Sequence, residues 1–279
     1  MLLTLQKLHT TEFASPPGVY FQLEKVLNNK DGTFEEIIQV IENDPPLAAR
    51  LLKMVNSPSY GLMGKVETIS HAVGIIGKEN LADLALATAA MAKFDAIPKE
   101  VFNMREFWCH SLACGFAAQL VAKHRNYPQP EQLYVAGMLH DLGQLVVLQN
   151  DPELYSKICM IAKNSLDPSL IKAEKEALGF DHAQIGGILL KEWRLPASIY
   201  TPVAHHHEPL KAQTCKEESL ILHVAEIMAY EVGFGKSSEP ALPILHKEAR
   251  KILNLNLDFV YEVRDQIKER AEEAFCTLF

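Results

Sequence analysis

The sequence predicts an all-helical protein from its helix caps, the spacing of its apolar residues and its lack of strand-like alternation. Thr33 and Glu36 have the form of a capping box ahead of an apolar run. Asp44 followed by Pro45 fits an N-cap with proline at the first helical position. Apolar side chains then recur at helical spacing, at Ala48, Leu51, Leu52 and Val55. No run of alternating apolar and polar residues indicates a strand, and no internal repeat is found.

Loop residues and a glycine divide the N-terminal third into short helices. Residues 56–61 combine Asn, Ser, Pro and Gly and are expected to form a loop. Residues 69–92 are rich in Ala, Leu and Ile, and we expect Gly77 to split them into two helices. Residues 95–98 are expected to connect this part of the chain to the next long helix.

The remainder of the chain is also expected to be helical. A long helix is predicted over residues 99–124, a proline-containing break over 127–130, and a further helix over 131–148. Asp181 with Gln184 three residues later predicts a capped helix start. Leu195 and Pro196 are expected to begin the helix that carries His205, His206 and His207. Further helices are predicted over residues 220–230 and 259–275.

Composition excludes several classes of protein. The chain has 279 residues, 48% of them hydrophobic, which is ordinary for a globular protein with a sizeable core. Its net charge is −8 and it has no basic stripe, so no clear nucleic-acid binding is indicated. Its five cysteines form no Cys-x-x-Cys pair. No apolar run reaches the ~18 residues of a membrane span, and no secretory signal is seen, so we expect no membrane association and a cytoplasmic location.

The histidines of the central region point to metal chemistry. His140 and Asp141 are adjacent, and together they offer a neutral nitrogen and an anionic oxygen, a mixture that borderline metals such as Fe, Mn and Zn accept. His110 precedes this pair on the apolar stripe of its own predicted helix, where a single histidine is more often a hydrogen-bonded core residue than a ligand.

The set taken together favours a metal site. Helical bundles build such sites from single side chains on several helices, and the predicted helices offer six candidate ligands, namely His110, His140, Asp141, His182, His206 and His207. These would hold one or two divalent transition-metal ions, with Fe or Mn favoured over Mg because imidazole suits transition metals. A buried polar network without a metal is the alternative. Whether His205 or His207 is the partner of His206 stays open, with His207 preferred.

These motifs resemble those of a known family. The order His, His-Asp, His and His-His is similar to the HD superfamily of metal-dependent phosphohydrolases, and the finer match is to its HDOD branch, the HD-related output domain of bacterial signalling proteins. The resemblance covers roughly residues 15–230 and rests on the segments at 43–52 (NDPPLAARLL), 55–57, 69–77, 136–143 (AGMLHDLG), 181–186, 193–196 and 206–207. It implies an HD-type helical bundle, with an N-terminal lobe over 1–95, a core carrying the metal-site motifs over 96–230 and a C-terminal helical appendage over 231–279.

Departures from the superfamily pattern bear on activity. Cyclic-dinucleotide phosphodiesterases of the superfamily carry a lysine where this chain has Gln144, and a Gly-Tyr-Pro loop that is absent here. Glu226 stands near the position of a late aspartate and is a possible additional ligand. The resemblance therefore implies a signalling module that acts mainly by binding a signalling protein partner. The alternative is an active phosphohydrolase on a nucleotide or phosphodiester ligand, in which Asp141 and Gln144 would be the catalytic residues.

Overall fold

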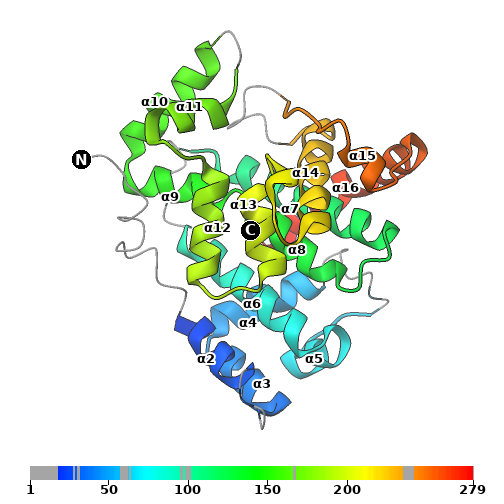
Figure 1. Ribbon diagram of the computed structural model, residues 1–279. Coiled ribbons are helices and arrows are strands. Elements are labelled where there is room, and N and C mark those ends of the chain that lie inside the picture. Colours follow the sequence, from blue (N-terminus) through cyan, green and yellow to red (C-terminus); the bar gives the residue numbers. More distant parts are fainter. Residues whose placement is uncertain are drawn as a thin grey trace. The chain divides into compact units, whose positions relative to one another are not determined.

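The structure is a computed structural model that describes residues 18–27, 29, 32–56, 62, 64–94, 97, 102–165, 168–234 and 242–278. Helices make up most of this part of the chain, and no strand occurs among the residues described (Figure 1). The prediction of an all-helical protein is confirmed. The chain divides into two compact units, one formed by residues 16–96 with 272–279 and the other by the remainder.

The first unit contains the helices α2 (Gly18–Leu27), α3 (Phe34–Glu42), α4 (Pro45–Val55), α5 (Ile69–Ile76) and α6 (Lys78–Lys93). The predicted capping box of Thr33 and Glu36 is present at the start of α3. Asp44 caps α4, accepting a hydrogen bond from the amide of Leu47. Gly77 separates α5 from α6 as predicted, with a positive φ of 80° that favours glycine. The two predicted connections, at 56–61 and 95–98, lie mostly outside the described residues.

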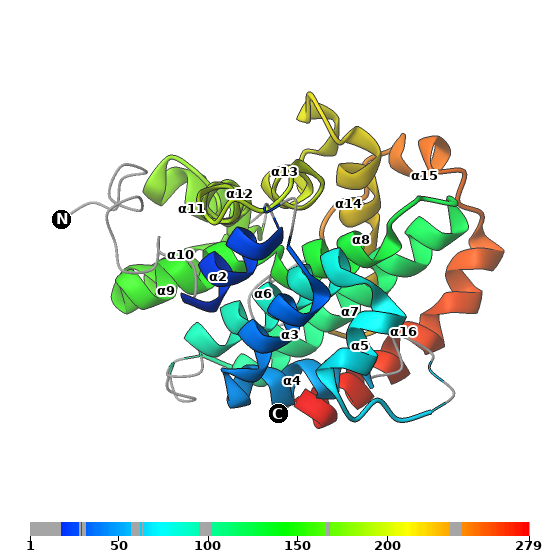
Figure 2. The same cartoon turned by 90° about the horizontal axis from the view of Figure 1, so that it is seen from below.

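The second unit contains the histidine motifs. Its helices are α7 (Met104–His124), α8 (Pro130–Leu139), α9 (Leu142–Asn150), α10 (Pro152–Asn164), α11 (Leu170–Leu178), α12 (His182–Glu192), α13 (Ala197–His205), the 3-10 turn η3 (Pro209–Lys211), α14 (Lys216–Glu231), α15 (Ala249–Ile252) and most of α16 (Leu257–Leu278). Figure 2 shows α12 and α13 side by side, seen almost along their axes. Helices α10 and α11 pack as a pair with a small apolar core of their own, made by Ile158, Ala162, Leu170 and Ala173.

Helix α7 is the central element of this unit. It is buried at every position from Phe107 to Gln119, as expected of a helix surrounded by others, and it packs chiefly against α8 and α14. Gly115 of α7 and Gly137 of α8 allow a close crossing, because a Cβ on Gly137 would lie 2.5 Å from the Cα of Gly115. His110 lies on α7, five residues before Gly115, and His140 directly follows α8, three residues after Gly137.

Three predicted helix boundaries were wrong. The helix predicted over 131–148 is broken, since α8 ends at Leu139, α9 begins at Leu142, and the His-Asp pair forms the turn between them. The helix predicted from residue 99 begins at Met104, where the Asn103 side chain accepts a hydrogen bond from the amide of Glu106. The predicted three-histidine helix ends at His205, so His206 and His207 lie in the turn that follows it.

No helix in the described part of the chain is both long enough and apolar enough to cross a bilayer. The division into 1–95, 96–230 and 231–279 stays a prediction.

Candidate metal centre

The turn between α8 and α9 places His140 and Asp141 at the middle of a polar cluster inside the second unit. The carboxyl group of Asp141 lies among three imidazoles. Its Oδ2 is 3.3 Å from Nε2 of His140 and 3.8 Å from Nε2 of His110, and its Oδ1 is 3.2 Å from Nε2 of His182. These side chains come from α7, from the turn and from the first residue of α12.

The turn after α13 supplies the paired histidines. His207 Nε2 is 2.8 Å from His182 Nε2, and the His206 ring centroid lies 5.1 Å from that of His140. Glu226 of α14 lies beside this pair, with Oε2 3.6 Å from Nδ1 of His207. The structure therefore brings the six predicted ligands and Glu226 together.

Within this cluster, three groups each have ligand atoms within 4.8 Å of one another. They are His182 with His206 and His207, His110 with His140 and Asp141, and His140 with His206 and Glu226. Histidines shared between groups link the cluster into one site.

Hydrogen bonds at the far side of three rings fix which nitrogen faces the centre. The Nδ1–H groups of His140 and His206 donate to the backbone carbonyls of Gly137 and Val203, both at 2.7 Å. His182 Nδ1–H donates to Oε2 of Glu174, also at 2.7 Å. Each Nε2 is thereby directed inward, which is the arrangement that metal-binding histidines usually have.

The residues present fit a divalent transition metal. His140 and His206 are fully buried, and their Nε2 atoms have no hydrogen-bond partner among the described residues. Buried polar atoms are nearly always paired, so inward lone pairs beside a carboxylate are well suited to a cation. Ligand atoms bound to one ion at ~2 Å lie about 3 Å apart, close to the 2.8 Å that separates the Nε2 atoms of His182 and His207.

Burial and neighbouring charges set the protonation of the site. Burial lowers the pKa of His110 to about 3 and holds the pKa values of His206 and His207 well below the usual value. Burial acts in the same direction on His182, but Glu174 and Asp141 outweigh it and raise its pKa well above the usual value. At neutral pH His110, His206 and His207 are therefore neutral imidazoles that can accept a metal, whereas His182 would have to release a proton to bind one.

The carboxylate of Asp141 is the main anionic group at the centre. Burial alone would raise its pKa, but His140, His182 and His110 together bring the pKa well below the usual value. Asp141 is therefore ionised at neutral pH and supplies the negative charge that a cation in this cluster needs.

Three further side chains are not among the six predicted metal ligands. Gln144 is buried, and its Oε1 accepts a hydrogen bond from the Tyr155 hydroxyl at 3.0 Å. His205 is half-buried and lines a neighbouring cavity. Glu174 was missed by sequence reasoning although it is fully buried beside His182. The available signal was its place on α11, where an acidic residue interrupts the buried stripe of Leu170 and Ala173.

His223 supports the site from α14. Its Nδ1–H donates to the backbone carbonyl of His206 at 2.7 Å, and its Nε2 accepts the backbone N–H of His246 at 2.9 Å. One neutral imidazole thus ties the turn that carries the paired histidines to the segment before α15.

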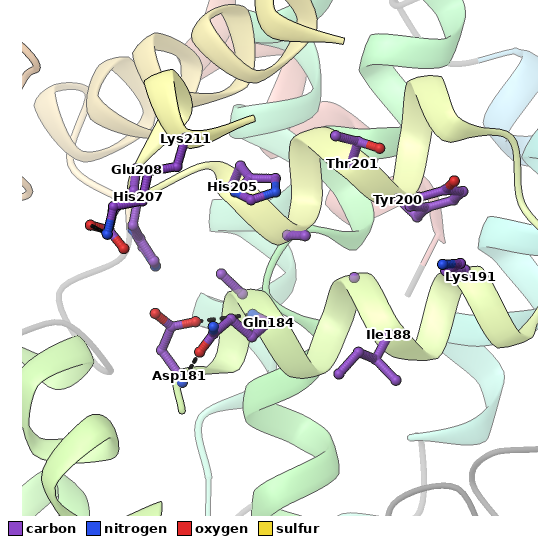
Figure 3. A pocket seen from close by; sticks show the side chains of 13 residues that line it. Asp181, Gln184, Ile188, Lys191, Tyr200, Thr201, His205, His207, Glu208 and Lys211 are labelled. Atoms are coloured by element: carbon purple, nitrogen blue, oxygen red, sulfur yellow. Dashed lines mark hydrogen bonds and ion pairs between the residues drawn. The ribbon is translucent and has the colours of Figure 1, made fainter. Parts of the chain in front are cut away.

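A cavity of about 400 Å³ lies between α12 and α13 and borders the cluster at His207. Figure 3 shows the side chains that line it, which are Asp181 just before α12, Gln184, Ile188 and Lys191 of α12, and Tyr200, Thr201 and His205 of α13. Lys211 and Glu208 lie at the end near His207 and are joined by an ion pair.

Comparisons with known proteins agree with this fold. Among solved structures, a candidate phosphohydrolase from Shewanella amazonensis SB2B is 25% identical, with a TM-score of 0.77 over 99% of this chain and 97% of the other. An HDOD domain protein of unknown function from Geobacter sulfurreducens is 22% identical, with a TM-score of 0.74 over 95% and 93% of the two chains.

At the sequence level, an uncharacterized protein of Treponema pallidum (strain Nichols) is 27% identical over 193 residues, which is 68% of this chain. The match covers 37% of that relative's own length. The model of the HDOD domain matches residues 13–209, about 70% of the chain. The protein therefore belongs to the HDOD domain family.

Proposed function

We propose that the protein is a bacterial HDOD signalling module of the cytoplasm, which acts mainly by binding a signalling protein partner and keeps a divalent transition metal as part of its structure. The observation that carries the proposal is the burial of the candidate ligands other than His207, which lines the cavity between α12 and α13. His110, His140, Asp141, His182 and His206 are each at most 2% exposed. Structural metal sites are closed by protein ligands, whereas catalytic sites keep a position open to water or substrate.

The ligand chemistry favours Fe or Mn over Mg as the bound ion. Five of the six proposed protein ligands are imidazoles, which suit transition metals, whereas Mg prefers oxygen ligands and retained water. His110, His140, Asp141, His182, His206 and His207 would hold the metal, with Glu226 as an additional ligand. A bound ion would supply the positive charge that compensates the Asp141 carboxylate and joins α7, α12 and the two turns.

Gln144 supports a module over an enzyme. It brings no positive charge to a phosphate, and its side-chain oxygen is already engaged by Tyr155. A positive charge placed where negative charge develops commonly stabilises the transition state by about 3 kcal/mol. Its absence at Gln144 would therefore slow phosphoester hydrolysis by roughly two decades.

The second candidate is a metal-dependent phosphohydrolase acting on a nucleotide or phosphodiester. The cavity between α12 and α13 favours it, because Lys191 and Lys211 line it and His207 lies at its border. Lysine ammonium groups attract phosphate. The similarity to the candidate phosphohydrolase of Shewanella amazonensis also supports this reading. In it, Asp141 would anchor the metal and Gln144 would stand in place of the superfamily's lysine.

Metal analysis and a turnover assay test both candidates. Protein purified without chelators is analysed for metal as wild type, as Asp141→Ala and as Asp265→Ala, an exposed aspartate of α16 that serves as control. We expect bound Fe or Mn in the wild type and the control, and none in Asp141→Ala. A wild type that binds no transition metal after incubation with Mn²⁺ would refute the proposed site.

The Mn²⁺-loaded protein is then assayed on cyclic dinucleotides, nucleotides and a generic phosphodiester. Bound metal without turnover supports the signalling module. Multiple turnover that disappears in Asp141→Ala and persists in Asp265→Ala would establish the phosphohydrolase instead.

A further inference from the structure

Glu174 is a fully buried acidic residue outside the predicted ligand set. It lies on α11, whose apolar face packs against α10 through Leu170 and Ala173. A buried carboxyl group is costly unless it is hydrogen-bonded or paired with a charge. The position therefore needs an explanation beyond the packing of the α10–α11 pair.

The carboxylate of Glu174 is hydrogen-bonded to His182. Its Oε2 accepts the side-chain Nδ1–H of His182 at 2.7 Å and the backbone N–H of the same residue at 3.0 Å. One oxygen thus holds both the ring and the backbone of the first residue of α12. With two bonds to one acceptor, the imidazole has little freedom to rotate, and its Nε2 stays directed at Asp141 and His207, 3.2 and 2.8 Å away.

The Nδ1–H group of His182 has a different kind of acceptor from those of His140 and His206. His140 and His206 donate their Nδ1–H groups to neutral backbone carbonyls three residues earlier in the chain. His182 donates to a carboxylate from another helix. A carboxylate acceptor strengthens the opposite nitrogen as a ligand and fixes the ring orientation. Among these three histidines, His182 alone donates its Nδ1–H to a carboxylate. A substitution of Glu174 can therefore test the contribution of this hydrogen bond by itself.

Helix α11 is held in this position by the next residue as well. Lys175 Nζ is 3.0 Å from Oδ2 of Asp181, immediately before His182, and 3.3 Å from Oε2 of Glu208, immediately after His207. Lys175 therefore binds the chain on either side of the contact between His182 and His207, and Glu174 binds His182 itself.

We infer that Glu174 is a positioning residue of the metal centre, which orients His182 and increases its strength as a ligand for a divalent transition metal. The inference rests on the proposed metal site and adds to it a residue on a helix that carries none of the ligands. It also assigns a role to the α10–α11 pair, whose packing carries Glu174 to the site.

The test compares Glu174→Gln with Glu176→Gln, an exposed glutamate on the same helix. The Glu174→Gln side chain retains an oxygen that can accept both bonds but lacks the negative charge. Mn²⁺ affinity is measured by titration, Co²⁺-loaded protein is examined by visible absorption, and circular dichroism verifies that each variant is folded. Loss of a carboxylate that supports a ligand typically weakens metal affinity by about 10–100-fold. We expect this loss in Glu174→Gln, with altered Co²⁺ absorption bands, and wild-type behaviour in Glu176→Gln.

A folded Glu174→Gln protein with wild-type affinity and an unchanged Co²⁺ spectrum would overturn the inference while leaving the metal site intact. A wild type that binds neither ion would overturn the proposed site together with this inference, so the two failures are distinguishable. If Glu174→Gln does not fold, Glu174→Asp provides the test, because it keeps the charge and withdraws the oxygen by one methylene. Reduced affinity in Glu174→Asp supports the positioning role, and wild-type affinity contradicts it.

Discussion

Replacement of Gly143 by alanine tests the packing that assembles the candidate metal centre. Gly143 lies in the first turn of α9, two residues after Asp141, and faces the start of α12. A Cβ at this position would lie 2.0 Å from the carbonyl oxygen of His182 and 3.0 Å from the amide nitrogen of Gly186. Both are backbone atoms, so no side-chain rotation relieves the contact.

The magnitude follows from these distances. Ordinary van der Waals contact begins near 3.4 Å, so α9 and α12 must separate by about 1.4 Å at this point. That shift is a large part of the 3.2 Å between His182 Nε2 and Asp141 Oδ1. Overpacking of this kind costs about 1–3 kcal/mol, and about 2 kcal/mol would lower the Tm of a protein of this size by roughly 4–8 °C.

The assay is thermal unfolding of the metal-free protein together with Mn²⁺ titration. The control is Gly74→Ala, at an exposed position of α5 where a Cβ would meet nothing within 4 Å. Alanine there should leave the protein unchanged or stabilise it by up to about 1 kcal/mol, the difference in helix propensity. If Gly143→Ala matched this control in both Tm and Mn²⁺ affinity, the argument that close approach of α9 and α12 assembles the centre would be refuted.

Two further predictions concern the pH dependence of stability and the capping of α3. The pKa of His110 is lowered from 6.5 to about 3, so between these values the unfolded chain binds a proton that the folded protein excludes. The metal-free protein should therefore lose stability as the pH falls from 6.5 towards 3, and the lowered pKa values of His206 and His207 act in the same direction. Urea unfolding at pH 7 and pH 5 should show a lower midpoint at pH 5; equal midpoints would contradict the lowered pKa values of these buried histidines. Thr33→Ala removes the side-chain acceptor of the Glu36 amide at the start of α3 and should cost about 1 kcal/mol, measured by urea unfolding. An unchanged midpoint would show that the capping box contributes nothing.

The parts of the fold that sequence reasoning predicted are those decided by near neighbours. The capping boxes at Thr33 and Asp181 and the division at Gly77 each depend on contacts within about four residues. The order of the motifs predicted that the histidines converge. In the structure, His110, His140 and His182 each have a ring nitrogen within 3.8 Å of the Asp141 carboxylate.

The break between α8 and α9 could not be predicted in the same way. The segment from 131 to 148 is apolar enough to continue as one helix, and the turn at His140 and Asp141 is set by packing against distant residues. Gly143 packs against the backbone of His182, 39 positions later in the sequence. Glu174 was missed for a related reason: its place on the buried stripe of α11 marks it as unusual, but its partner His182 lies on another helix.

The bridge made by His223 bears on how the site should be compared between proteins. The HDOD model ends at residue 209, yet the carbonyl of His206 is bound by a side chain beyond that limit, and that side chain is bound in turn by the backbone of His246. Glu226, which approaches His207, also lies outside the match. Two members that agree throughout the matched region can therefore differ in the residues that hold the paired histidines. Relatives should be grouped by what they carry at the positions of His223 and Glu226, in addition to the ligand motif.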